Sequence, residues 1–261
     1  MTRRPGRAMD GPIGLHGGGE YQTGDEPFLD ALIGVAREAA NARINGADPA
    51  TAPIRIVILP TAAARGRPDM AAAMGISALT GRAGRVGQPF RVDVAAIVDA
   101  TSARDVANVE LLASADLIHL PGGDPDLIPT ILAGSPALTA IRAARERGAV
   151  IAGASAGGMA LAEWTWTPAG GVRGLGFVAG LAVVPHYDDV RRTAWQRALD
   201  RLAPGGIGYL GLDERTGAIS DGDIDGGRRW RIAGPGAAYW FPRGADQPTI
   251  ARHGETIDIP G

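Results

Sequence analysis

The sequence predicts an α/β fold in which a mostly parallel sheet is flanked by helices, with β-hairpins added at the C-terminal end. Apolar runs of strand length alternate with helix-like periodic segments as far as Glu163. From Trp164 onward the pattern changes to short strands and Gly-rich turns. The 261 residues contain neither a linker nor an internal repeat, which favours one domain over 11–261 after a flexible basic tail at 1–10.

The first part of the chain carries the predicted parallel sheet. Its strands are short apolar runs that end near Gly or Pro: 11–16, 54–59, 92–98, 117–120 and 149–154. Its helices are 26–43, 68–79, 103–112 and 156–163, with interrupted helical pieces up to Arg147. The segment 26–43 is typical of an amphipathic helix, because Phe28, Leu32 and Val35 recur at helical spacing.

The second part is predicted to be rich in β-structure. One clear helix covers 189–202, and hairpin-like strands follow from Tyr209 to the end. The strands 230–232 and 237–241 are expected to pair around the turn Gly234-Pro235-Gly236.

Composition excludes several kinds of chemistry. The chain has no Cys, and all 26 basic residues are Arg, so thiolate, disulfide and Schiff-base lysine chemistry are ruled out. A net charge of -2 argues against nucleic acid as a partner. No apolar stretch is long enough to span a membrane or to form a signal peptide, so we expect a cytoplasmic protein without membrane partners. The four His residues lack metal-ligand spacing, and we expect neither metal nor cofactor.

Ser155 is the strongest candidate for a nucleophile. It is the centre of Gly153-Ala154-Ser155-Ala156-Gly157, between an apolar strand and a helix-compatible run. A tight strand-to-helix turn with small neighbours presents the serine oxygen above the sheet edge, as in a nucleophile elbow. The alternative is a plain turn in which Ser155 only caps the helix.

His186 is the best candidate for the general base. It follows Val183-Val184-Pro185 at a predicted strand end, where sites collect in open α/β sheets. His119 lies within a strand and is expected to be packed, and His253 is expected to be exposed near the C-terminus.

The developing oxyanion needs backbone amides. The Ala156 amide follows the nucleophile directly, and the Gly122-Gly123 turn after the strand 117–120 is the expected second source. A βα turn without function is the alternative for Gly122-Gly123.

These motifs together resemble the dipeptidase E and cyanophycinase group of serine peptidases. The resemblance rests on Gly122-Gly123-Asp124, the Gly-x-Ser-Ala-Gly elbow, Pro185-His186, and the segment Gly211-Leu212-Asp213-Glu214-Arg215-Thr216. It covers roughly residues 11–243 and implies a three-layer fold like that of class I glutamine amidotransferases. It also implies Ser155 as nucleophile, His186 as its histidine and Asp124 near the substrate.

The resemblance implies a small acidic peptide, aspartyl or β-aspartyl, as substrate and partner; a homodimer is compatible with it. Pro125 stands where cyanophycinases have Gln, which argues against cyanophycin itself.

The orienting acid of the triad has several candidates. Asp188 is preferred, because two-residue spacing in an extended chain keeps it on the same side as His186. Asp189 and Asp213 are the alternatives, and either Asp188 or Asp189 could instead cap the following helix. Glu163 is expected to lie about 12 Å from Ser155 along the helix, which is too far.

Two other functions remain open. His16-Gly17-Gly18-Gly19 resembles the oxyanion motif of α/β-hydrolase esterases, in which Asp213 and His253 would complete the triad. A non-catalytic protein of the same fold could instead hold an anionic ligand at its Gly-rich strand ends.

Overall fold

The computed structural model describes residues 10–44, 48, 52–167, 170–187, 189–202, 205–224 and 227–260. The predicted basic tail, 1–10, lies outside this part of the chain except for its last residue, and Asp188 lies outside it as well.

The larger of two sheets is built around parallel strands. Its order is β14-β11-β10-β1-β5-β4-β2-β3. The parallel strands are β1 (Ile13–His16), β5 (Val150–Ala154), β4 (Leu117–Leu120), β2 (Ile54–Ile58) and β3 (Phe90–Val94). Antiparallel strands extend it beyond β1: β10 (Gly217–Ile224), β11 (Gly227–Ala233) and β14 (Thr256–Pro260).

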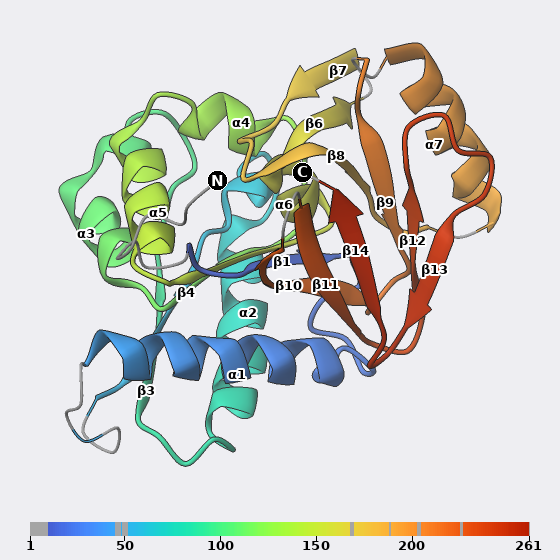
Figure 1. Ribbon diagram of the computed structural model, residues 1–261. Helices are drawn as coiled ribbons and strands as arrows, with labels where there is room; N and C mark the ends of the chain where they lie inside the picture. Colours follow the sequence, from blue (N-terminus) through green and yellow to red (C-terminus); the bar gives the residue numbers. More distant parts are fainter. Residues whose placement is uncertain are drawn as a thin grey trace, which may run out of the picture.

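Helices cover both faces of this sheet because its strands alternate apolar side chains between two sides. Ile54, Ile56 and Ile58 pack on one side with α1 (Glu26–Arg43) and α2 (Pro68–Ala83). Val57 and the neighbouring strands pack on the other side with α3 (Val106–Ser114) and α5 (Pro136–Glu146). Figure 1 shows α1 on one side of the sheet and α3 and α5 on the other. The predicted α/β class is therefore confirmed.

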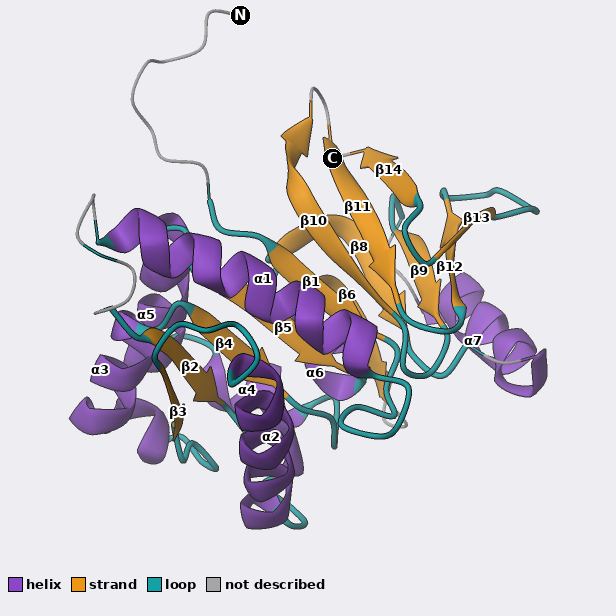
Figure 2. Ribbon diagram, turned by 90° about the horizontal axis from the view of Figure 1, so that it is seen from below, coloured by secondary structure: helices purple, strands orange, loops and turns teal. Residues whose placement is uncertain are grey.

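The smaller sheet has the order β13-β12-β9-β8-β6-β7. Its strands are β6 (Ala162–Thr167), β7 (Gly170–Arg173), β8 (Val178–Val184), β9 (Gly208–Leu212), β12 (Ala237–Phe241) and β13 (Thr249–Arg252). One face shares the main core with β11 and β14. On the other face, Trp164 of β6 and Tyr187, which follows β8, belong to a second cluster with Leu199 of α7 (Asp189–Leu202). Figure 2 shows α7 beyond this sheet.

Several predicted elements differ from the structure. Trp230 and Ala237 lie in strands that do not pair: β11 joins the larger sheet and β12 the smaller one. The reason is Gly234, whose φ of 136° turns the chain from one sheet to the other. The helix after Ser155 is also shorter than expected, since α6 covers Ala156–Leu161 and β6 follows at once. The helices 26–43 and 189–202 and the strand 117–120 are confirmed.

The strand register places the site at one edge of the larger sheet. His16 of β1 is level with Ala154 of β5, and Leu120 of β4 is level with Gly153. The loops after these three strands therefore meet around Ser155. The loop after β4 also contains α4 (Leu127–Leu132).

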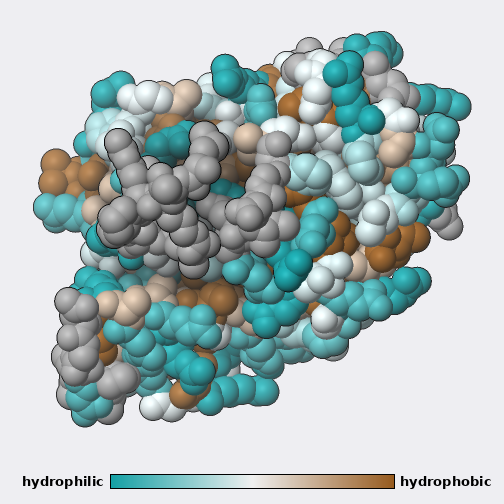
Figure 3. All heavy atoms as spheres, viewed as in Figure 1, coloured by the Kyte–Doolittle hydropathy of each residue, from teal (hydrophilic) through white to brown (hydrophobic). Residues whose placement is uncertain are grey.

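The surface seen in Figure 3 is mostly hydrophilic, with hydrophobic residues in small separate groups. None of the helices in the described part of the chain is both long and apolar enough to cross a membrane.

Candidate active site

Ser155 sits in a strained turn between β5 and α6. Its φ of 49° and ψ of −115° are unusual for a residue with a side chain. This tight turn requires glycine on either side of Ser155, because a Cβ on Gly153 would lie 2.3 Å from the Gly157 carbonyl carbon. A Cβ on Gly157 would lie 2.1 Å from the Leu120 carbonyl oxygen. The predicted elbow is thus present in the backbone, and its glycines have a steric reason.

His186 lies opposite Ser155, just after β8. Its Nε2 is 3.1 Å from the Ser155 Oγ, although the two residues come from different sheets. Its backbone also has a positive φ, 50°, and its amide donates a 2.7 Å hydrogen bond to the Gly17 carbonyl. The nucleophile and the general base predicted from the sequence, Ser155 and His186, are therefore brought together by the fold.

Glu214 completes a chain of three side chains. Its Oε1 lies 2.7 Å from the His186 Nδ1, and it stands on the connection from β9 to β10. With Nδ1–H donating to this carboxylate, Nε2 is left to accept the proton of the Ser155 hydroxyl. Glu214 is 47% exposed and His186 28%, so the pair lies at the mouth of the site.

Glu214 is not among the acids that the sequence predicted for the triad. Its preferred acid, Asp188, lies outside the described residues, and the side chain of Asp189 is not described. Asp213 has another role: its Oδ2 accepts a 2.8 Å hydrogen bond from the Ala237 amide, and burial raises its pKa. Glu163, predicted to lie too far from Ser155, accepts a hydrogen bond from the Gly180 amide. The sequence did contain a signal for Glu214: this acid lies just beyond the end of β9, within the segment 211–216 on which the family resemblance partly rests.

Backbone strain is concentrated around this site. In the described part of the chain, the non-glycine residues with positive φ are Tyr21, Ser155, His186 and Arg215. Two of them belong to the chain of three side chains, and Arg215 follows Glu214. Strained residues of this kind persist where surrounding contacts hold them, and they cluster at functional sites.

The turn after β4 lies beside Ser155, as predicted. An ideal Cβ on Gly122 would be 3.1 Å from the Ser155 Cβ, so the Gly122 backbone adjoins the nucleophile. Gly123 has a φ of 151° and packs against the Ala62 carbonyl, while the Asp124 amide donates to that same carbonyl. The Ala156 amide is at the first residue of α6, where the helix itself supplies no acceptor.

The loop between β1 and α1, residues 17–25, supports His186 rather than forming an esterase-type oxyanion hole. Besides the Gly17 bond to His186, the Gly18 carbonyl accepts a 2.7 Å hydrogen bond from the Arg215 amide. Gly18 has a φ of 97°, and a Cβ there would lie 2.3 Å from the His186 Cε1. His253, the base of the esterase alternative, is exposed and accepts from the Gly234 amide.

Buried polar contacts hold this loop in place. His16 and Asp25 are both buried, with 2.8 Å between Nε2 and Oδ1, and the other Asp25 oxygen accepts from the Tyr21 amide. The Tyr21 hydroxyl is 2.7 Å from the His119 Nδ1. Burial lowers the pKa of His119 to about 4 and raises that of Tyr21 well above its ordinary value. His119 is packed, as the sequence predicted, and neutral at pH 7.

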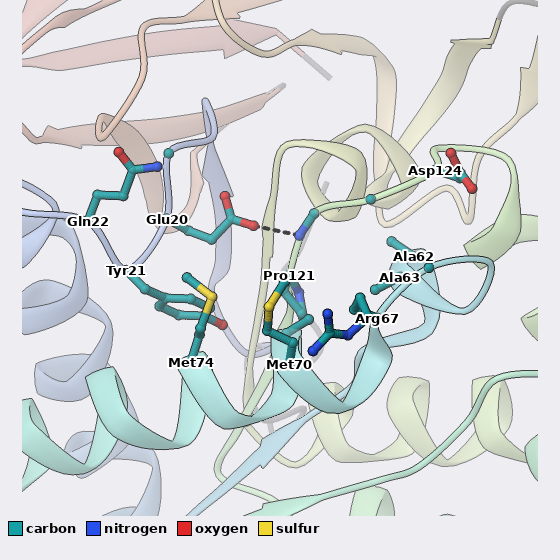
Figure 4. A pocket seen from close by; sticks show the side chains of 15 residues that line it. Glu20, Tyr21, Gln22, Ala62, Ala63, Arg67, Met70, Met74, Pro121 and Asp124 are labelled. Atoms are coloured by element: carbon teal, nitrogen blue, oxygen red, sulfur yellow. Dashed lines mark hydrogen bonds between the residues drawn. The ribbon is translucent and has the colours of Figure 1, made fainter.

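Two cavities flank the Ser155–His186 pair. The first, of about 480 Å³, extends from the Gly122 turn to α2, which contributes Met70 and Met74 to its wall (Figure 4). Its lining is Gly19, Glu20, Tyr21, Gln22, Ala62, Ala63, Gly66, Arg67, Met70, Ala71, Met74, Pro121, Gly122, Gly123 and Asp124. The second, of about 350 Å³, is lined by His186, Tyr187, Asp213, Glu214, Arg215, Pro235 and Gly236.

Comparison with known proteins points to one family of peptidases. The model of peptidase family S51 matches residues 55–223. A crystal structure of a peptidase from an acI-B1 Actinobacterium is 25% identical, with a TM-score of 0.75 over 96% of this chain and 98% of the other. A protein described as a peptidase E from Listeria monocytogenes EGD-e shares the fold, with a TM-score of 0.51 and 13% identity over 94% of this chain and 99% of the other. The search of curated proteins found no match.

Proposed function

The chain belongs to peptidase family S51 and is a serine-type peptidase, and we propose that it cleaves small acidic peptides through Ser155, His186 and Glu214. The observation that carries the proposal is the continuous contact from the Ser155 Oγ through the His186 ring to the Glu214 carboxylate, at 3.1 and 2.7 Å. This is the arrangement that a hydroxyl needs to become a nucleophile near neutral pH.

The proposed reaction has two halves. The Ser155 Oγ attacks the scissile carbonyl carbon while His186 Nε2 takes the hydroxyl proton, and Glu214 stabilises the resulting imidazolium. The imidazolium then gives that proton to the leaving amine as the C–N bond breaks, which leaves an acyl-enzyme. Water, deprotonated by the same nitrogen, hydrolyses the acyl-enzyme and restores Ser155. The Ala156 and Gly122 amides are the proposed donors to the oxyanion.

The two cavities suggest how a short peptide would lie. His186 must reach the leaving amine, so the leaving residue belongs in the cavity that His186 lines. Arg215 lines that cavity too, and its guanidinium suits the carboxylate of a leaving C-terminal residue. The acyl residue then occupies the cavity beside Gly122, where Arg67 can attract an acidic side chain.

A fluorophosphonate probe and a dipeptide panel test the proposal. We expect wild-type protein to be labelled at Ser155 and to hydrolyse dipeptides with an N-terminal Asp. Ser155→Ala should lose labelling and turnover while keeping its melting temperature within a few degrees, because only one oxygen is removed. Absence of both labelling and turnover in the wild type would contradict the proposal and favour a non-catalytic binding protein.

A further inference from the structure

In the structure, the carboxylate of Glu20 already accepts a hydrogen bond from the Gly122 amide, which is one of the two proposed donors to the oxyanion. The Glu20 Oε1 accepts a 2.7 Å hydrogen bond from the Gly122 amide, and Figure 4 shows this contact crossing from the β1–α1 loop to the turn after Pro121. The same oxygen would lie 2.9 Å from a Cβ on Gly122, which in turn would be 3.1 Å from the Ser155 Cβ. The Glu20 carboxylate is therefore next to the nucleophile.

We propose that Glu20 masks the Gly122 amide in the free enzyme and releases it when the free α-ammonium group of a substrate binds to the Glu20 carboxylate. The inference rests on the proposed function, and it makes Glu20 the residue that selects peptides with an unblocked N-terminus.

The first reason is the charge of Glu20. It is half-buried, lines the first cavity and has no Arg within ion-pair distance among the residues that the structure describes. Its acidic neighbour Asp25 is already paired with His16, and Tyr21 is neutral. A half-buried carboxylate without a cation attracts one more strongly than an exposed carboxylate does, because water screens it less.

The second reason is the shape of a peptide N-terminus. The α-nitrogen is two bonds from the carbonyl carbon, so it lies roughly 3 Å from the carbonyl oxygen. A carbonyl oxygen that approaches the Gly122 amide therefore brings the ammonium group close to Glu20. The carboxylate exchanges a hydrogen bond to an amide for one to a cation, and the amide becomes free for the oxyanion.

The exchange explains how the site could choose its substrates. A peptide with an acetylated N-terminus, or a bond inside a longer chain, has no cation to draw Glu20 away. Such a carbonyl would have to compete with a carboxylate for the Gly122 amide and would be left near an unpaired negative charge. Cleavage would then be restricted to the first peptide bond of a chain.

Two substitutions separate masking from recognition. Glu20→Gln keeps an oxygen that can accept from the Gly122 amide but removes the charge that attracts an ammonium group. Glu20→Ala removes both. Glu38→Gln, on the exposed side of α1, is the matched control for loss of one acidic group. Thermal unfolding of all four proteins checks that the folds are comparable.

The first measurement is the ratio of kcat/KM for aspartyl-leucine and its N-acetyl form. We expect wild type and Glu38→Gln to prefer the free peptide strongly. Both Glu20 variants should lose about tenfold or more of that preference, since a hydrogen bond to a charged group is worth about that factor. An unchanged ratio in both variants would overturn the assignment of Glu20 as the ammonium site.

The second measurement is the rate of labelling by an uncharged alkyl fluorophosphonate, whose phosphoryl oxygen needs the same amide donors. Glu20→Ala should react about tenfold faster than wild type, whereas Glu20→Gln should stay close to it. Equal rates in wild type and Glu20→Ala would overturn the masking while leaving the serine peptidase intact. Absence of labelling in every protein would instead overturn the proposed function.

Discussion

The Cα of Gly18 supports the imidazole of His186: a methyl group at Gly18 would lie 2.3 Å from the His186 Cε1 and 2.5 Å from its Nε2. No side chain fits there without moving the ring. The loop after β1 therefore fixes the position of a base that is supplied by the other sheet.

Replacing Gly18 by Ala should displace the His186 ring and lower kcat by about a hundredfold, since a misplacement near 1 Å can cost that much. Gly24→Ala is the matched control, because its φ is also positive, at 98°, yet its Cβ would meet Arg215 at an ordinary 3.6 Å. Both variants should lose roughly 1 kcal/mol of stability from the left-handed backbone. Steady-state kinetics on the same dipeptide distinguishes them, and equal activities would mean that the ring adapts.

Glu214→Gln should lower kcat by about a hundredfold or more, because an amide stabilises the imidazolium less well than a carboxylate. Asp213→Asn, one residue earlier, tests another acid that the sequence offered, and Glu38→Gln, at an exposed position, is the control for loss of one acidic group. Asp188→Asn tests the acid that the sequence favoured. If Asp188→Asn reduces kcat while Glu214→Gln does not, the orienting carboxylate is Asp188.

Acid should destabilise the protein partly through His119. Its pKa is lowered to about 4 in the folded state from 6.5, so between these values the unfolded chain binds a proton that the folded chain does not. Stability that is present above pH 6.5 is lost as the pH falls toward 4, by about 3 kcal/mol for this group.

Urea unfolding of His119→Gln at pH 7.5, 5.5 and 4.5 measures this contribution. The variant should lose less stability over the range than the wild type does, and His253→Gln, at an exposed position, controls for loss of a surface imidazole. Identical pH dependence in wild type and His119→Gln would show that His119 is not the group responsible.

Arg67→Gln should weaken the preference for an N-terminal Asp over an N-terminal Ala by about twofold to fivefold. The effect is small because Arg67 is largely exposed, and exposed ion pairs contribute under about 1 kcal/mol. The preference should also fall as salt is raised. Arg37→Gln, on the exposed side of α1, is the control, and an equal preference in both variants would remove Arg67 from substrate recognition.

Local patterns in the sequence were enough to predict several elements of the larger sheet and of the helices that cover it. The helix 26–43 and the strand 117–120 have the bounds that were expected, because each has its own periodicity or apolar run between turn residues. Ser155 and His186 could be identified because each directly follows an apolar strand. Ser155 is also the centre of a Gly-x-Ser-x-Gly turn, and His186 follows Pro185.

Partners across long separations were not predictable in the same way. Glu214 meets His186 only because β9 ends in one sheet and β10 begins in the other, which no local periodicity encodes. The error at β11 and β12 has the same origin: two strands joined by a short turn are expected to pair, but Gly234 directs them to different sheets.

The Ser155–His186–Glu214 contacts span both sheets: Ser155 follows a strand of the larger one, His186 a strand of the smaller one, and Glu214 lies on the chain crossing between them. The rate of hydrolysis should therefore depend on the position of the two sheets relative to each other. A substitution such as Leu210→Ala, in the core that the sheets share, could slow the reaction without touching any reacting group. During denaturation, activity should disappear before the strands themselves do.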